Sequence, residues 1–130
     1  AISSYDGMLK MYQCRTDTNE WERGTSHAVK QKGEKILEYK SNSHLIKDTI
    51  DVPCYTLQTY LKDNKITSID MLKIDAEGHE MDIIEAYDWS VLPTYIKMEH
   101  YHIDDIKMKS MLEKKGYIVY TESRDLYAIR

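Results

Sequence analysis

The sequence has no phenylalanine, and its 130 residues include only two prolines and two cysteines. So few cysteines argue against a fold held together by disulfides, and Cys14 and Cys54 stand in no CxxC pair or other zinc-binding spacing. We expect both to be free thiols in a reducing compartment, which favours the cytoplasm. No apolar run approaches the roughly 20 residues that a helix needs to cross a bilayer, so no membrane segment is expected.

Clustered positive charge is also missing. Lysine and arginine total 18 against 22 aspartates and glutamates, which gives a formal net charge of -4. A face that binds nucleic acid needs clustered basic side chains, and the short basic stretch at 30–35 is expected to be a solvated loop. No nucleic-acid partner is therefore predicted. The remaining composition, 42% hydrophobic and 31% charged, is that of a globular protein with one domain's length of chain.

The first part of the chain predicts two strands separated by a long loop. Residues 8–14 alternate their side chains after an Asp-Gly turn signal, which is typical of a strand. Residues 15–35 are polar and irregular, as in a long loop. Residues 50–55 predict a short strand that Pro53 interrupts, and this suits an edge position.

Helix and strand patterns then alternate. The sequence predicts a helix capped by Thr56 and ending near Asn64, a strand over 69–75, a helix over 78–87, a strand over 95–99, a helix from Asp104 and Asp105 to about Gly116, and a hairpin of 117–120 with 126–129. This order is typical of an α/β sheet that is parallel for most of its width. The strands 69–75 and 95–99 should be parallel and joined by a right-handed crossover. Apolar side chains at odd and even positions of 69–75 predict a strand covered on both faces.

Polar residues follow both strands of this expected parallel pair. The first strand is followed by Asp75, Ala76 and Glu77, and the second ends in Glu99, followed by His100, Tyr101 and His102. Ligands of open α/β sheets bind beyond the carboxyl ends of the strands. We therefore expect Asp75 and Glu99 to lie on one rim, within reach of a shared ligand.

Three uses of such a rim remain open. Its carboxylates and histidines could orient a hydroxyl and remove its proton, or they could bind a divalent metal, although nothing here fixes a ligand geometry. In the third interpretation, Glu77 and Glu80 only favour the positive end of the following helix. Topology and residue type together favour a functional role for Asp75. Lys73 is expected to bury its stem and extend its ammonium group to solvent at the strand end.

One run of the sequence points to a known family. It reads Ile69-Asp70-Met71-Leu72-Lys73-Ile74-Asp75-Ala76-Glu77-Gly78-His79-Glu80. This run resembles the signature of FkbM-type methyltransferases, which show Ile-Asp, Leu-Lys-Ile-Asp, Glu-Gly and a further Glu. Three further segments are similar to other parts of that family: residues 1–7, residues 52–57 and the strand 95–99.

The resemblance implies a Rossmann-like class I methyltransferase that binds S-adenosylmethionine and methylates a hydroxyl of a small molecule or saccharide. This chain would supply the carboxyl-terminal half of the sheet, closing with an antiparallel hairpin. The glycine-rich loop of the family's amino-terminal half is not found in residues 1–130. We therefore expect 1–130 to be a single partial domain that is inactive alone. The missing amino-terminal half, or another chain, should cover the edge of strand 69–75.

The resemblance and the rim together suggest roles for individual residues. The catalytic candidates are Asp75 and His100; the cofactor-binding candidates are Ala1, Ile2, Asp75, Ala76 and Glu77; the substrate-binding candidates are His79, Glu99 and His102; no metal ligand is predicted. Two other functions are compatible with these residues. A methyltransferase-like domain could serve as a non-catalytic scaffold subunit of a larger assembly, and the rim acids could belong to a metal-dependent hydrolase.

Overall fold

A computed structural model describes residues 1–14, 46–76, 78–100 and 103–130 of the chain. The loop predicted over 15–35 lies outside the described residues. The chain divides into two compact units. The smaller contains Ala1 and Gly7–Cys54, and the larger contains Ile2–Asp6 and Tyr55–Arg130.

The smaller unit contains an antiparallel pair of strands, β1 (Gly7–Cys14) and β2 (Ile46–Cys54). The first strand was predicted at nearly these bounds, whereas the second begins earlier than the predicted 50–55. Pro53 does not interrupt β2, because it stands in register opposite Met8. Among the described residues β2 pairs with β1 alone, so a residue without an amide proton is tolerated at its other edge.

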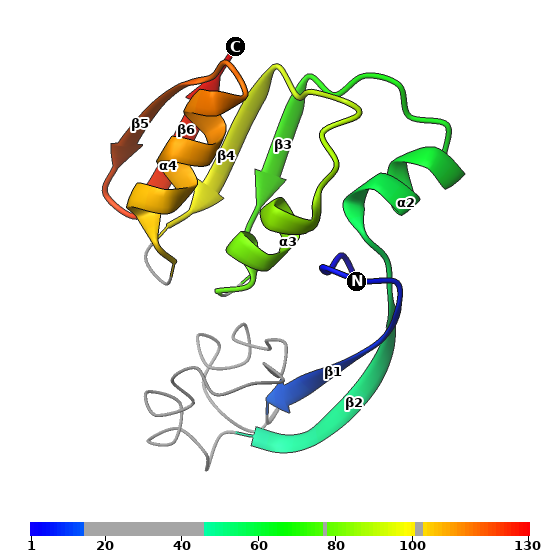
Figure 1. The fold of residues 1–130 in the computed structure, drawn as a ribbon. Helices are drawn as coiled ribbons and strands as arrows, with labels where there is room; N and C mark the ends of the chain where they lie inside the picture. The colour runs from blue at the N-terminus through cyan, green and yellow to red at the C-terminus, as the bar shows by residue number, and fades with distance from the viewer. Residues whose placement is uncertain (15–45, 77, 101–102) are drawn as a thin grey trace. The chain divides into compact units, whose positions relative to one another are not determined.

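The larger unit follows the predicted order of helices and strands (Figure 1). Its elements are α2 (Leu57–Asp63), β3 (Met71–Ile74), α3 (Glu80–Ala86), β4 (Tyr95–Glu99), α4 (Asp105–Lys114), β5 (Ile118–Glu122) and β6 (Asp125–Ile129). The four strands form one sheet in the order β3-β4-β6-β5. β3 and β4 are parallel, and the other neighbours are antiparallel. The predicted parallel pair and the terminal hairpin are both confirmed, and the fold is mixed α/β.

The helix ends are formed by the residues that the sequence predicted. The Thr56 hydroxyl accepts the amide of Thr59 at 3.3 Å at the start of α2, and Asp104 caps α4 in the same way. At the end of α4, Gly116 has a φ of +91°, a left-handed conformation that favours glycine. The amide of Tyr117 reaches back to the carbonyl of Leu112 at 3.2 Å. This bond completes a Schellman motif and turns the chain into β5.

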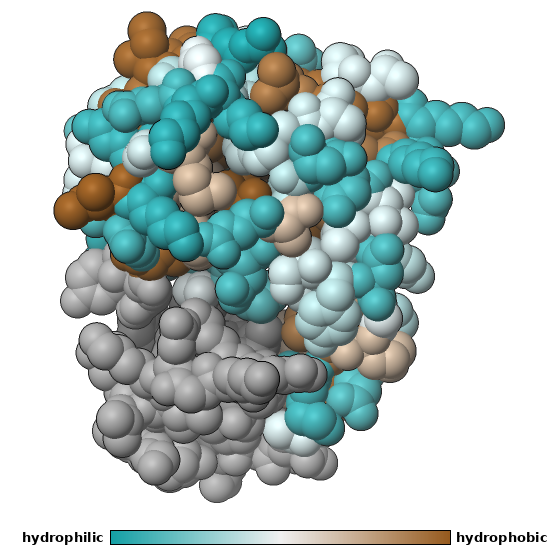
Figure 2. All heavy atoms as spheres, viewed as in Figure 1, coloured by the Kyte–Doolittle hydropathy of each residue, from teal (hydrophilic) through white to brown (hydrophobic). Residues whose placement is uncertain are grey.

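The main core of the larger unit lies between the sheet and its helices. α3 and α4 lie on one face of the sheet (Figure 1). The strand residues that point toward them and are fully buried are Ile96, Met98, Leu126 and Ala128. The helix residues Ile84, Met108 and Leu112 pack against them and are equally buried. On the outward side of these helices, hydrophilic side chains dominate the coloured surface (Figure 2).

The other face of the sheet is covered by no helix in the part of the chain that the structure describes. We call it the open face; its residues are Met71, Lys73, Tyr95, Lys97, Glu99, Ile118, Tyr120, Glu122, Asp125, Tyr127 and Ile129. Among these described residues, the prediction that β3 is covered on both faces is therefore wrong. Ile74 is buried, but Met71 is 53% exposed, because the described helices pack against one face only.

Candidate functional site at the carboxyl ends of β3 and β4

The pairing of β3 with β4 brings the two predicted acidic positions to the same end of the sheet. Ile74 stands in register with Met98, so Asp75 and Glu99 follow at equivalent places on neighbouring parallel strands. The strand register confirms that the two residues lie at the same end of the sheet, as expected. Because the buried side chains of β4 alternate with those of Lys97 and Glu99, Glu99 belongs to the open face.

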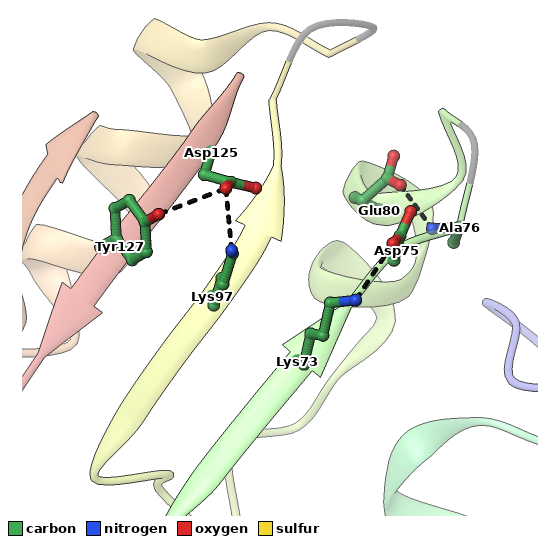
Figure 3. Close-up of polar contacts among 7 residues, drawn as sticks. All are labelled: Lys73, Asp75, Ala76, Glu80, Lys97, Asp125 and Tyr127. Atoms are coloured by element: carbon green, nitrogen blue, oxygen red, sulfur yellow. Dashed lines mark hydrogen bonds and ion pairs between the residues drawn. The ribbon is translucent and has the colours of Figure 1, made fainter. Parts of the chain in front are cut away.

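Asp75 is a solvent-accessible carboxylate whose charge is balanced by a neighbour. Its Oδ2 lies 3.2 Å from Nζ of Lys73, as Figure 3 shows, and the two side chains are 54% and 57% exposed. The lysine ammonium reaches solvent at the strand end, as predicted. An ion pair this exposed adds little stability. Asp75 therefore retains acceptor capacity for a ligand on the rim.

A buried carboxylate shapes the turn that follows Asp75. Glu80 is 1% exposed, and its Oε1 accepts the amide proton of Ala76 at 2.7 Å (Figure 3). Within the same turn the amide of His79 donates to the carbonyl of Ala76, and Gly78 has a φ of +92°. A buried hydrogen bond is costly to lose, because its partners would be left unsatisfied away from water. Glu80 thus fixes the backbone next to Asp75, which goes beyond the dipole role that the sequence suggested.

Both ring nitrogens of His79 contact other protein groups. Nε2 lies 3.1 Å from the Ser3 hydroxyl, and Nδ1 lies 2.8 Å from a carboxylate oxygen of Asp82. The sequence singled out His79 but not its two partners. Ser3 is separated from His79 by 76 positions, and no local pattern links two such distant residues.

The end of β4 is less densely bonded. The amide of His100 donates to the carbonyl of Arg124 at 2.9 Å. Its ring Nε2 is buried and has no hydrogen-bond partner among the residues that the structure describes. His102, a predicted substrate contact, lies outside the described residues, as does Glu77 on the β3 side.

A second ion pair lies beside the rim on the open face. Nζ of Lys97 is 2.8 Å from Asp125, and the Tyr127 hydroxyl donates to the same carboxylate at 3.2 Å (Figure 3). The hydrogen bond from Lys97 is the main reason that the pKa of Asp125 lies below its usual range, and Lys73 adds to this effect. The same bond raises the pKa of Lys97. Sequence reasoning missed Asp125 because it had placed this residue in a polar turn.

The sequence matches the Methyltransferase FkbM domain over residues 1–119. That match covers far more than half of the chain, including both strand ends of the rim. The chain belongs to the FkbM methyltransferase family. No curated protein and no solved structure matches the chain. The resemblance that the signature at 69–80 carried is thereby confirmed.

Two predicted cofactor contacts of this FkbM methyltransferase domain lie at the start of the chain. Ile2 is half-buried, forms a parallel bridge with Tyr55 and packs against the apolar core of the larger unit. Ala1 belongs to the smaller unit, where its amino group donates to the Pro53 carbonyl at 2.7 Å. Ala1 therefore belongs to the smaller unit and Ile2 to the larger one.

The described part of this methyltransferase domain contains no group of three His, Cys, Asp or Glu residues that could hold a metal ion. Within the same described ranges, no helix has both the length and the apolar character to cross a membrane.

Proposed function

We propose that this chain is the carboxyl-terminal part of a Rossmann-like class I methyltransferase. The intact protein would use S-adenosylmethionine to methylate a hydroxyl of a small molecule or saccharide. The observation that carries this proposal is the rim, where Asp75 and Glu99 stand at the shared carboxyl end of two parallel strands. Ligands bind at such ends in open α/β sheets, and membership of the FkbM family supplies the type of reaction.

The residues at the rim fit the proposed cofactor chemically. An ionised carboxylate accepts hydrogen bonds from hydroxyl and ammonium groups, and Asp75 offers one that is more than half exposed. Ala76, whose backbone amide Glu80 holds, would contribute from the turn after β3, and Glu77 was predicted as a further cofactor contact. Ile2, which belongs to the same unit as the rim, would contribute from the start of the chain. When bound, S-adenosylmethionine supplies an electrophilic methyl group on a sulfonium centre.

The protein's part in the reaction is to orient the acceptor hydroxyl and remove its proton. Asp75 and His100 are the proposed catalytic groups, since a carboxylate or a neutral imidazole can serve as general base. The buried Nε2 of His100, which has no described partner, supports this role. His79, Glu99 and His102 were predicted to contact the acceptor. Proximity and orientation would contribute more than acid–base chemistry, because the methyl donor is already reactive.

A complete site needs more than these 130 residues. β3 forms one edge of the described sheet and pairs with β4 alone, and an unpaired strand edge readily recruits another strand. The sequence also contains no glycine-rich cofactor loop. We propose that a further segment of the intact protein, or another chain, pairs with β3, and that residues 1–130 alone transfer no methyl group.

Isothermal titration calorimetry with S-adenosylhomocysteine on the intact protein tests the proposal. Asp75→Asn should weaken binding by about tenfold, which corresponds to about 1.4 kcal/mol. Asp70→Asn changes an exposed carboxylate at the opposite end of β3 and should bind like the wild type. Equal affinity of Asp75→Asn and wild type would contradict the proposed site. An intact protein that binds no S-adenosylhomocysteine would favour the scaffold interpretation.

A further inference from the structure

Ser3, His79 and Asp82 form a chain of polar contacts that the proposed reaction does not use. The Ser3 hydroxyl lies 3.1 Å from Nε2 of His79, and an Asp82 carboxylate oxygen lies 2.8 Å from Nδ1. Ser3 is completely buried, and the His79 side chain is 13% exposed. We call this chain the Ser3–His79–Asp82 relay.

The chemistry of the partners assigns the protons. A carboxylate only accepts, so the 2.8 Å contact between Nδ1 and Asp82 is favourable when Nδ1 carries a hydrogen. The contact has ion-pair distance but lacks the alignment of a full hydrogen bond. In the neutral ring Nε2 is then the acceptor, and the Ser3 hydroxyl donates to it. The imidazole thus lies between a hydrogen-bond partner, Ser3, and a carboxylate at ion-pair distance, Asp82.

The order serine, histidine, aspartate also occurs in hydrolases, where it activates a nucleophilic hydroxyl. The surroundings of Ser3 argue against that use. The residue is 0% exposed, so its hydroxyl has no path to a substrate. Its amide donates to the Tyr55 carbonyl at 2.9 Å, and it is therefore not available to stabilise an oxyanion. The relay has the geometry of a positioning device.

The relay joins two segments that the proposed cofactor site needs together. On one side, residues 2–6 are held beside the start of α2, where Asp6 accepts the amide of Thr56 at 2.6 Å. On the other side, His79 closes the turn that follows Asp75, with its amide bonded to the Ala76 carbonyl. Within the described residues, the Ser3–His79 contact links these two segments side chain to side chain.

We propose that His79 is a positioning residue that sets the spacing between Ile2–Ser3 and the turn at Ala76, and thereby the width of the cofactor site. This inference rests on the proposed function. It gives His79 a role through other residues, in place of the direct substrate contact that the rim position suggested. Loss of any relay member should change cofactor affinity without unfolding the domain.

The test uses the intact protein with S-adenosylhomocysteine as the probe. Ser3→Ala and His79→Gln should each weaken binding by about tenfold, and the double variant should be little worse than either single one, because they remove the same contact. Their melting temperatures should stay within about 3 °C of the wild type. Ser110→Ala, on α4, is the matched control and should bind normally.

Imidazole ¹⁵N NMR provides a second measurement that does not depend on the cofactor. The neutral His79 ring should carry its proton on Nδ1, and Ser3→Ala should shift the Nε2 resonance. The proposed role of His79 would be overturned if Ser3→Ala bound S-adenosylhomocysteine as tightly as the wild type. It would also be overturned by a proton on Nε2 of the neutral ring, or by affinity losses that merely follow losses in melting temperature. If the wild type binds no S-adenosylhomocysteine, the proposed function fails. If the wild type binds it and the variants bind it equally well, only the proposed role of His79 fails.

Discussion

The two faces of the four-stranded sheet differ in the side chains that the same strands place on them. On the helix-covered face, Ile96, Met98 and Leu126 are fully buried and belong to the main apolar core. On the open face, the alternate positions carry Lys97, Asp125 and their polar contacts. Burial of apolar area is the main source of stability, so the helix-covered face should hold the fold. Substitutions at the rim beside the open face should then affect ligand binding more than stability.

Two tyrosines show the same contrast between the buried and the open face, because each donates a hydrogen bond from its side-chain hydroxyl. Tyr117 is 4% exposed and donates to the Pro93 carbonyl at 2.5 Å. Tyr127, on the open face, donates to Asp125 at 3.2 Å in a partly exposed setting. A hydrogen bond that shields a buried acceptor matters more than one that water can replace.

The largest effect is expected from truncating the buried face. Ile96→Ala should lower the free energy of unfolding by about 2–5 kcal/mol, since it leaves a cavity in a closely packed core. Ile129→Ala removes the same atoms from the open face, where the side chain is 47% exposed, and should lower it by less than about 1 kcal/mol. Urea denaturation of the intact protein measures both. Similar values for the two variants would show that the open face is also covered.

The tyrosine pair should give the next largest difference. Tyr117→Phe leaves the buried Pro93 carbonyl without its donor and should lower the free energy of unfolding by about 1–2 kcal/mol. Tyr127→Phe should change it by no more than about 0.5 kcal/mol. The same denaturation experiment applies. A larger loss in Tyr127→Phe than in Tyr117→Phe would reverse the contrast between the faces.

The smallest effect concerns the Lys97–Asp125 pair and depends on pH. The folded pKa of Asp125 lies below its usual value of 3.8, so its charged form stabilises the fold above about pH 3.8. This stabilisation is lost as the pH falls through the folded pKa. The stability gap between the wild type and Asp125→Asn should therefore be constant near neutrality and close in acid. Thermal melts across pH measure it.

Lys97→Met provides the control for that pH dependence. The hydrogen bond from Lys97 is the main cause of the lowered pKa, so Asp125→Asn should have little effect on the acid profile in a Lys97→Met background. If Asp125→Asn changes the acid profile as much in that background as it does in the wild type, a group other than Lys97 lowers the pKa of Asp125.

Much of the larger unit could be predicted because its signals are local. The caps Thr56 and Asp104 and the turn glycine Gly116 were read from short patterns, and the strand 95–99 was predicted with its exact bounds. Whether β3 is covered on one face or two depends on where distant helices pack, which periodicity does not encode.

The candidate site was predictable only in part, for the same reason. Topology alone was enough to place Asp75 and Glu99 at one end of the sheet. The partners of His79 could not be predicted, because the contact with Ser3 joins residues 76 positions apart. The burial of Glu80 was also missed, since a charged residue at a helix start is usually exposed.

The central claim is that the cofactor binds at the carboxyl ends of β3 and β4, and hydrogen exchange tests it most directly. Amide exchange of the intact protein should be followed by mass spectrometry with and without S-adenosylhomocysteine. We expect slower exchange in peptides covering 71–76 and 96–100, and no change at 87–94, which precedes β4 at the opposite end of the sheet. Protection at 87–94 without protection at 71–76 would contradict the account.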